Sequence, residues 1–141
     1  MDERIAMFKN IVEELIPFNK FIGVQLVEVK EGFVKLKVPF KPELVGNPML
    51  NALHGGLIST VMDTAGGAAG MTTLTSFEDR ISTIDMRVDY LRPGQAKDLI
   101  VEGKITRSGN RIVATAMKAY HPEEELSLIA EGRGVYNVKR N

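Results

Sequence analysis

The chain contains no cysteine, which excludes disulfide bonds, thiolate zinc sites and a cysteine nucleophile. It also has no excess of either charge, because 18 Lys and Arg residues balance 18 Asp and Glu residues. This balance gives no electrostatic reason to expect nucleic acid or an anionic membrane as the main partner. The N-terminus, MDERIAMFKNIVEEL, is acidic and amphipathic and therefore unlike a signal peptide, so we expect a cytoplasmic protein.

No segment has the composition expected of a membrane-spanning helix. Residues 55–77 lack Lys, Arg and Glu, but they contain five Gly, seven Ser or Thr, and Asp63. The 141 residues suffice for one domain that buries roughly two-thirds of the surface exposed by its unfolded chain. Because no linker, repeat or low-complexity tract interrupts the sequence, we expect a single domain over residues 1–141.

The spacing of apolar residues predicts two helices. The first covers about residues 3–16 and ends at Pro17. The second covers about residues 55–73, and its apolar and small residues lie all round the axis, which indicates a buried helix. Strand patterns occupy residues 24–30, 33–40, 82–91, 97–107, 111–120 and 126–138, and segment 41–53 is expected to be a loop. Short turns between consecutive strands predict an α+β fold in which an antiparallel sheet wraps around the buried helix.

Alternation along residues 82–91 predicts which side chains of that strand face the core. The inward set is mostly apolar and consists of Ile84, Met86, Val88 and Tyr90. The outward set is polar and consists of Thr83, Asp85, Arg87 and Asp89.

Asp63 is the only charged residue between Leu44 and Phe77, although charged residues make up 26% of the chain. A carboxylate on a buried helix must be paired, hydrogen-bonded or protonated, since burying it bare costs several kcal/mol. Ser59 and Thr60 share its helix face and could donate hydroxyl hydrogen bonds. Asp63 is therefore a structural carboxylate held by these hydroxyls, one that reaches solvent at an interface, or a catalytic carboxylate in a partly desolvated cleft.

His54, Gly55 and Gly56 stand where the second helix is expected to begin. The first N–H groups of a helix have no partner within it, and with the positive end of the helix dipole they can bind an anion or a developing oxyanion. Glycine also lets a ligand approach the backbone closely. The same three residues are compatible with a purely structural helix start, and no phosphate-binding glycine pattern is present.

The distance between Gly55 and Asp63 has a consequence for the oligomeric state. Eight residues of helix separate Gly55 from Asp63, which is roughly 12 Å along the axis at 1.5 Å per residue. One carbonyl carbon cannot lie close to both groups on the same helix. If both serve one reaction, they come from different subunits, and an enzyme with this sequence is expected to be at least a dimer.

Two motifs together resemble the hotdog-fold acyl-CoA thioesterases, specifically the PaaI-like or acyl-CoA thioesterase 13-like branch. The first is HGG followed, eight residues after its first glycine, by an acidic residue on a Gly/Ala-rich helix; the second is STIDMRVDYLRPG at residues 82–94. The segment FIGVQLVEVKEGFVKLKVPFKPE is similar to the family's first hairpin. The resemblance covers about residues 18–138 and implies a hotdog fold whose sheets pair into a dimer, with a dimer of dimers as the further expectation.

The resemblance implies roles for four residues. Asp63 matches the family's catalytic acid, which acts as a nucleophile or as a general base on water. Gly55 matches the residue whose backbone N–H polarises the thioester carbonyl from the partner subunit. His54 matches the histidine beside it, which shapes or polarises the site. Thr83 matches a Ser or Thr position that helps to orient the attacking water.

The resemblance also suggests where the substrate binds. Family members commonly place Asn or Gln six residues before the HGG histidine, but Pro48 occupies that position here. Either Asn47 or Asn51 takes over this polar contact with the substrate carbonyl. Gly56 is expected to lie against the substrate because it leaves the backbone accessible.

Coenzyme A carries several phosphate groups, so we expect basic residues near the mouth of the cleft. Arg111 in SGNR matches a turn that the family uses near the pantetheine arm, and Arg92 in LRPG is a second candidate. Apolar residues of the second helix accept an acyl chain or pack in the core; they are Leu57, Ile58, Val61 and Met62.

We therefore expect hydrolysis of acyl-CoA thioesters to a free acid and coenzyme A. No metal or organic cofactor is expected, because coenzyme A belongs to the substrate and only His54 and His121 could supply imidazole ligands. Two other classes stay open at this point: a hotdog protein that binds acyl-CoA without turnover, and a hotdog hydratase or dehydratase.

Overall fold

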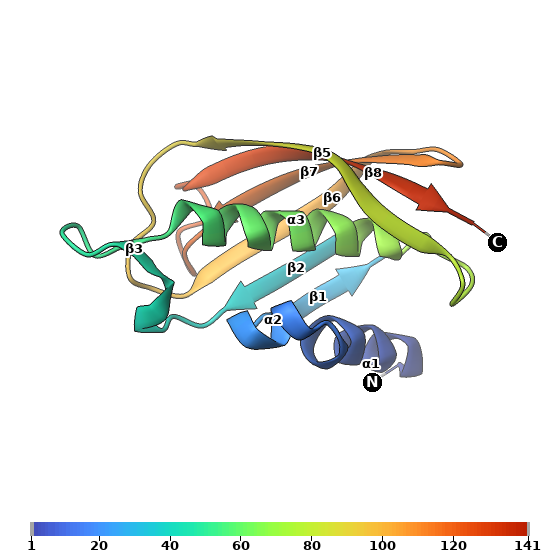
Figure 1. Cartoon of the computed structure of the whole chain (residues 1–141), viewed down its shortest axis with the longest axis horizontal. Helices are drawn as coiled ribbons and strands as arrows, with labels where there is room; N and C mark the ends of the chain where they lie inside the picture. The colour runs from blue at the N-terminus through green and yellow to red at the C-terminus, as the bar shows by residue number, and fades with distance from the viewer. Residues whose placement is uncertain (1, 141) are drawn as a thin grey trace.

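The computed structural model describes residues 2–140 (Figure 1). The helical elements are α1 (Glu3–Asn10), a π-helical segment η1 (Ile11–Leu15), α2 (Pro17–Ile22), a 3₁₀ turn η2 (Pro42–Leu44) and α3 (Gly55–Met71). The strands are β1 (Gln25–Lys30), β2 (Phe33–Val38), β3 (Val45–Asn47), β4 (Ala52–Leu53), β5 (Arg80–Tyr90), β6 (Leu99–Ser108), β7 (Ile112–Tyr120) and β8 (Ala130–Lys139).

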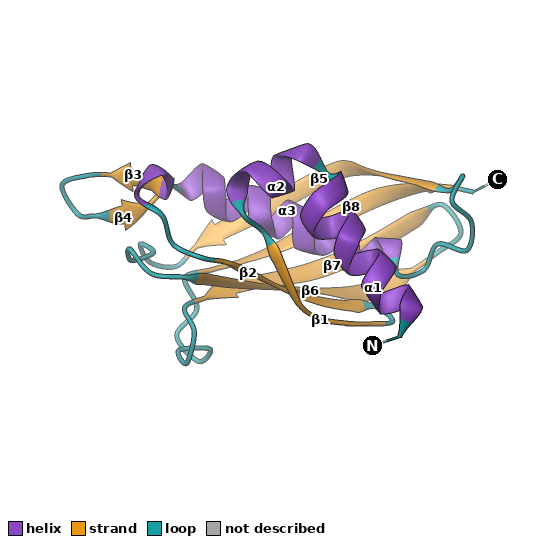
Figure 2. Cartoon of the chain, turned by 90° about the horizontal axis from the view of Figure 1, so that it is seen from below, coloured by secondary structure: helices purple, strands orange, loops and turns teal. Residues whose placement is uncertain are grey.

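Six of these strands form one antiparallel sheet in the order β1-β2-β6-β7-β8-β5. α3 lies against one face of the sheet and contacts β2, β5, β6, β7 and β8 (Figures 1 and 2). α1 and α2 lie beside α3 on the same side, next to β1 (Figure 2). The predicted α+β architecture, an antiparallel sheet around a central helix, is confirmed.

Small residues let α3 approach the sheet closely. A β-carbon on Gly103 of β6 would overlap the carbonyl oxygen of Ala65 and lie 2.9 Å from the backbone nitrogen of Gly66. Main chain of the helix therefore rests almost directly on main chain of the sheet. Around this contact the core closes with branched and sulfur-containing side chains, among them Leu36, Ile58, Val61, Met62, Val101 and Met117.

The opposite face of α3 is not covered by this chain. Gly56 is exposed, and Ser59, Thr60, Asp63 and Gly67 are only partly buried. The expectation that α3 is buried on all sides is therefore wrong for the single chain. Small and weakly polar residues leave this face without the charged groups that normally mark a solvent-facing helix surface.

The ends of several elements differ from the sequence-based expectation. The first helical stretch, α1 followed by η1, ends at Leu15 as predicted, and Ile16 before Pro17 has an extended backbone; the prediction missed that Pro17 then starts a further helix, α2. Proline suits the first turn of a helix, where its missing N–H needs no partner. The last strand begins at Ala130 rather than at residue 126, since residues 121–127 form hydrogen-bonded turns. Within residues 2–140, no helix is both long and apolar enough to cross a bilayer.

Segment 41–53, expected to be a loop, contains the turn η2 and the hairpin β3–β4. The hairpin projects beyond the start of α3 (Figures 1 and 2). Met49 and Leu50 at its tip are 92% and 67% exposed. The chain thus presents two apolar side chains at the end of a narrow projection.

His121 is a structural histidine. It is buried, its Nε2 accepts the N–H of Gln95 at 2.9 Å, and its Nδ1 lies 2.8 Å from the carbonyl oxygen of Asp98. In the neutral form Nδ1–H donates to that carbonyl, so both ring nitrogens serve to join the start of β6 to the end of β7.

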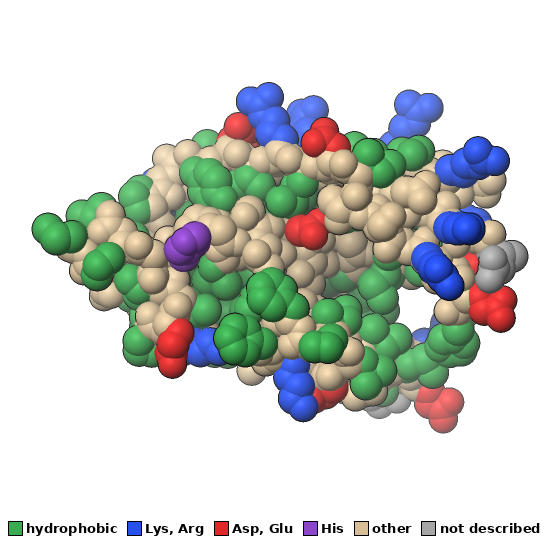
Figure 3. Space-filling model, viewed as in Figure 1, with side chains coloured by type: hydrophobic (Ala, Val, Ile, Leu, Met, Phe, Trp, Pro, Cys, Tyr) green, Lys and Arg blue, Asp and Glu red, His purple; other side chains and the backbone are tan. Residues whose placement is uncertain are grey.

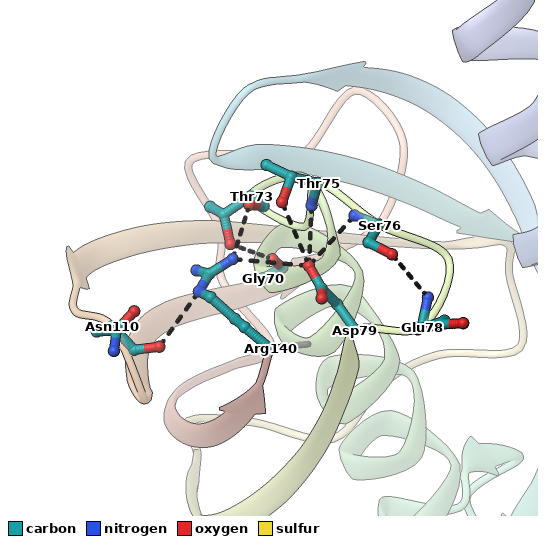
Figure 4. A network of polar contacts seen from close by, with 8 residues as sticks. All are labelled: Gly70, Thr73, Thr75, Ser76, Glu78, Asp79, Asn110 and Arg140. Carbon is teal, nitrogen blue, oxygen red and sulfur yellow. Dashed lines mark hydrogen bonds and ion pairs between the residues drawn. The ribbon is translucent and has the colours of Figure 1, made fainter.

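A polar network fixes the segment that connects α3 to β5 (Figure 4). The carboxylate of Asp79 accepts hydrogen bonds from the N–H groups of Thr75 and Ser76 at 3.1 and 3.2 Å. Arg140 lies 3.9 Å from this carboxylate and also donates to the backbone oxygens of Thr73 and Asn110. The network therefore ties the end of α3, the β6–β7 turn and the end of β8 together, and it sets where β5 begins.

Replacement of Asp79 by alanine should lower the free energy of unfolding by about 2 kcal/mol, because two backbone N–H groups and the Arg140 guanidinium lose a charged partner whose side chain is 1% exposed. Denaturant unfolding measures this difference. Asp85→Ala, which removes an exposed carboxylate from β5, is the matched control and should change stability by less than about 0.5 kcal/mol. Equal losses in the two variants would contradict the role assigned to the network.

Candidate active site

Asp63 lies in the middle of α3, on the face that this chain leaves open, and its side chain is held by two hydroxyl groups. Thr83 Oγ1 of β5 donates to Asp63 Oδ1 at 2.9 Å. The hydroxyl of Tyr136 on β8 lies 3.2 Å from the same oxygen and 3.1 Å from the backbone oxygen of Asp63. Within residues 2–140, Oδ2 of Asp63 has no hydrogen-bond partner.

The expected donors Ser59 and Thr60 do not hold this carboxylate. Ser59 Oγ donates instead to the backbone oxygen of Gly56, 3.1 Å away and three residues earlier. Such bonds to the preceding turn are the usual choice of a serine inside a helix. The donors to Asp63 come from two strands that are 20 and 73 residues away in sequence.

In the part of the chain that the structure describes, no cation compensates the charge of Asp63. Among the ion pairs of residues 2–140, none includes this carboxylate. Hydrophobic and uncharged side chains dominate the middle of the face that exposes α3, whereas Lys and Arg side chains gather towards its periphery (Figure 3). The isolation of Asp63 in the sequence is therefore matched by its isolation in space.

An irregularity in β5 directs Thr83 towards Asp63. The pairing of β5 with β8 shifts register between Thr83 and Asp85, as in a β-bulge. A bulge resets the alternation of side chains, and Ile84, expected to point inward, is 54% exposed. The alternation-based expectation is thus wrong for Ile84 and also for Tyr90, which is 51% exposed, whereas Thr83 is exposed as expected and reaches Asp63 on the open face of α3.

The start of α3 carries three of the predicted site residues: His54, Gly55 and Gly56. His54 is the N-cap residue, and its Nδ1 accepts the N–H of Gly56 at 2.8 Å. This bond requires an unprotonated Nδ1, so neutral His54 carries its proton on Nε2. The N–H of Gly55 has no partner within residues 2–140, while the carbonyl oxygen of Gly55 accepts from the hydroxyl of Tyr90 at 2.7 Å. Gly55 thus presents the first free donor of the helix.

Two glycines make room for the imidazole. A β-carbon on Gly56 would lie 2.9 Å from Cε1 and Nδ1 of His54, and one on Gly46 would lie 2.6 Å from its Cα. The second glycine of HGG is therefore needed by the imidazole, and its N–H is already used.

The predicted substrate-binding residues lie at both ends of α3. Asn47 Oδ1 accepts from the N–H groups of Met49 and Leu50 and so stabilises the tip of the β3–β4 hairpin. Asn51, in the same hairpin, has a φ of 52°, which asparagine tolerates better than most residues. No hydrogen bond in residues 2–140 joins either asparagine to His54 or Asp63.

Arg111 belongs to the β6–β7 turn, at the other end of α3. Arg140 links the neighbouring Asn110 to Thr73, two residues beyond the helix. Arg92 is held by a hydrogen bond from its guanidinium to the backbone oxygen of Ser127.

The four apolar residues of α3 that were considered for binding the acyl chain differ in burial. Ile58, Val61 and Met62 are buried in the core, and Leu57 alone is partly exposed.

The profile of the thioesterase superfamily matches residues 50–128, which include α3, Asp63 and Thr83. The chain belongs to the thioesterase superfamily. It is 36% identical over 135 residues to the medium/long-chain acyl-CoA thioesterase YigI of Escherichia coli K12, covering 87% of this chain and 86% of the relative. The resemblance noted from the sequence is thereby confirmed, and the chain is a thioester hydrolase.

Solved structures agree with the fold. A thioesterase-superfamily protein from Shewanella oneidensis superposes with a TM-score of 0.83 at 31% identity, covering 97% of this thioesterase and 96% of that chain. The Escherichia coli PaaI protein superposes with a TM-score of 0.77 at 20% identity, covering 95% and 88%. The hotdog fold is confirmed.

Residues 2–140 contain no cluster of three or more His, Asp or Glu side chains arranged to hold a metal ion. The independence of the reaction from metals and organic cofactors stays a prediction.

Gly56→Ala should weaken both the helix start and the activity, because the new methyl group displaces the imidazole that caps α3. Loss of a helix cap costs about 1 kcal/mol, and we expect that loss in denaturant unfolding together with slower thioester hydrolysis. Gly67→Ala on the same helix is the control, since its β-carbon meets Tyr136 at an ordinary 3.6 Å. If Gly56→Ala were as stable and active as Gly67→Ala, the capping role would be refuted.

Proposed function

We propose that this thioesterase hydrolyses acyl-CoA thioesters with Asp63 as the reacting carboxylate. The observation that carries the proposal is a carboxylate with one oxygen held by two hydroxyls, the other oxygen unpartnered within residues 2–140, and no cation beside it. Asp63 either removes a proton from water, which attacks the carbonyl carbon, or attacks that carbon itself to form an anhydride that water then opens. In both cases the C–S bond breaks, and the products are a carboxylic acid and the thiol of coenzyme A.

The thioester oxygen is proposed to bind the free N–H of Gly55 from a second subunit. A developing oxyanion gains from a fixed donor at the positive end of a helix. Gly55 and Asp63 of one chain are separated by eight helical residues, roughly 12 Å at the rise of an α-helix. A carbonyl group therefore cannot touch both within one chain, whereas two antiparallel copies of α3 bring the start of one helix to the middle of the other.

The edge strand β5 supports such a dimer. It has 11 residues, lies at one edge of the sheet and carries exposed Ile84 and Tyr90. Long edge strands that carry exposed apolar residues are suited to pairing with another strand. Pairing of β5 with β5 of a second copy would continue the sheet, cover the open face of α3 and give two equivalent sites. A dimer of dimers is a further proposal.

The remaining residues fit this arrangement in stated roles. Thr83 fixes Asp63 and the attacking water. His54 holds the start of α3 in shape through the N–H of Gly56, and Gly56 serves the substrate site by leaving room for this imidazole. Arg111 lies in the β6–β7 turn, beyond the end of α3, and is proposed to bind a phosphate of coenzyme A.

For the acyl group we propose a medium or long chain, as in the name of the Escherichia coli relative. α2 offers an apolar surface beside α3: Phe18 and Phe21 are 57% and 75% exposed, and their rings stack at 6.5 Å. Asn19 between them lies 3.5 Å from Thr64, the residue after Asp63. An acyl chain that leaves the carbonyl along α3 would meet these rings.

Either Asn47 or Asn51 of the partner is proposed to reach the substrate carbonyl in place of the family's Asn or Gln. The hairpin that carries both residues projects from the start of α3, the end that faces the second subunit in this dimer. The cytoplasm is the proposed location.

Asp63→Asn should lower kcat for acyl-CoA hydrolysis by at least about 100-fold, because the amide can neither accept a proton from water nor attack the carbonyl. Free thiol is measured with a thiol-reactive dye over acyl-CoAs of increasing chain length; the chain has no cysteine, so the dye sees only product. Glu31→Gln, which changes an exposed carboxylate in the turn between β1 and β2, is the matched control and should retain full activity. Retained turnover in Asp63→Asn would refute the role of this carboxylate. Tight acyl-CoA binding by the parent protein, without thiol release from any substrate, would identify a non-catalytic binding protein.

Gly55→Pro tests the shared site. Proline removes the N–H at a first helical position that it tolerates, and His54 before it has the extended backbone that proline requires. The variant should lose most activity, whereas Gly55→Ala, which keeps the N–H and adds a methyl group 3.5 Å from Tyr90, should lose little.

Mixing two inactive variants then tests whether Gly55 and Asp63 of one site come from the same subunit or from different subunits. When Gly55→Pro and Asp63→Asn subunits are refolded together, each mixed dimer contains one intact site, and about a quarter of the parent activity should return. No recovery, with mixed dimers demonstrated, would place the two groups in one chain.

A further inference from the structure

The side chain of Tyr136 reaches Asp63 from the sheet, on which α3 packs. It projects from β8, is 1% exposed, and places its hydroxyl within 3.2 Å of Asp63 Oδ1. No other tyrosine of the chain contacts this carboxylate, since Tyr90 donates to Gly55 and Tyr120 to Glu102. Burial and the neighbouring carboxylate raise the pKa of Tyr136 above its usual range, so the hydroxyl keeps its proton and acts as a donor.

The space for this side chain is made by glycines. A β-carbon on Gly66 would overlap the Tyr136 hydroxyl, and one on Gly134 would lie 2.8 Å from Cε1 of the ring. Glycine inside a helix costs about 1 kcal/mol relative to alanine. Alanine at position 66 with a smaller apolar residue at position 136 would fill the same space and give a more stable helix. Glycine at position 66 instead leaves room for the Tyr136 hydroxyl beside Asp63.

The hydroxyls of Tyr136 and Thr83 meet at one oxygen of Asp63. Thr83 donates to Oδ1, and the single proton of the Tyr136 hydroxyl is shared between Oδ1 at 3.2 Å and the backbone oxygen of Asp63 at 3.1 Å. Together these contacts limit the rotation of the carboxylate and leave Oδ2 as the oxygen directed away from the fold's own donors. A carboxylate has only acceptor sites, so the two donors do not compete with each other.

We propose that Tyr136 is a positioning residue that orients Asp63, so that Oδ2 faces the thioester or the attacking water. The proposal rests on the proposed function of Asp63. It predicts that removal of the Tyr136 hydroxyl slows the chemical step, because a freely turning carboxylate spends less time in the productive orientation.

Tyr136→Phe is expected to lower kcat about 10-fold while KM changes by less than about 2-fold, since the hydroxyl touches Asp63 and not the substrate. Tyr120→Phe is the matched control: it removes one hydroxyl from an equally buried tyrosine, 2% exposed, that contacts Glu102. Its kcat and KM should equal those of the parent. A kcat for Tyr136→Phe equal to that of the parent overturns the proposal, and so do equal kcat losses in the two variants.

The double variant separates this proposal from the proposed function. In the Asp63→Asn background, Tyr136→Phe should cause no further loss of the residual activity; an undiminished 10-fold loss would show that Tyr136 acts independently of Asp63 and overturns the proposal. If Asp63→Asn itself retains full activity, the proposed function fails first. If Tyr136→Phe does not fold, a fluorinated tyrosine at this position keeps the ring and strengthens the donor, and a kcat unchanged from that of the parent would overturn the proposal.

Discussion

Close packing of α3 on the sheet is the constraint on which the rest of the structure depends. Main chain meets main chain at Gly103 and Ala65, and the helix passes directly over the Tyr136 ring at Gly66. The separation of helix and sheet decides whether a strand side chain can reach a helix carboxylate. Because it is short, hydroxyls from β5 and β8 both arrive at Asp63. The small residues of α3 therefore serve the site as well as the core.

Neutral donors hold Asp63 without neutralising it. A lysine or arginine in the place of Thr83 or Tyr136 would stabilise the anion strongly and weaken it as a base or nucleophile. Hydroxyl hydrogen bonds are directional and individually modest. They fix the orientation of the carboxylate while its charge stays available, which gives a physical reason for the absence of cations over the whole segment 44–77.

The two halves of the proposed site lie on one rigid helix, and this has consequences for assembly. α3 keeps the free N–H of Gly55 and the carboxylate of Asp63 at a fixed separation that one thioester cannot span. Rigidity that would prevent reaction within a chain would become useful between chains, because the two-fold axis of the proposed dimer would pair the start of one helix with the middle of the other. The unpaired edge of β5 and the open face of α3 lie on the side where that pairing would occur.

Local patterns in the sequence determined much of this protein. Apolar periodicity predicted α3 and all six strands of the main sheet, the helix-start chemistry of HGG predicted the free N–H, and the loss of charge around Asp63 singled out that carboxylate. These features depend on neighbours within one or two turns of chain. Only the tertiary structure decided which donors hold Asp63, since Tyr136 is 73 residues distant and looks in the sequence like a core aromatic of β8. The register shift in β5 beside Thr83 and the open face of α3 likewise follow from strand pairing and close packing, which involve residues far apart in the sequence.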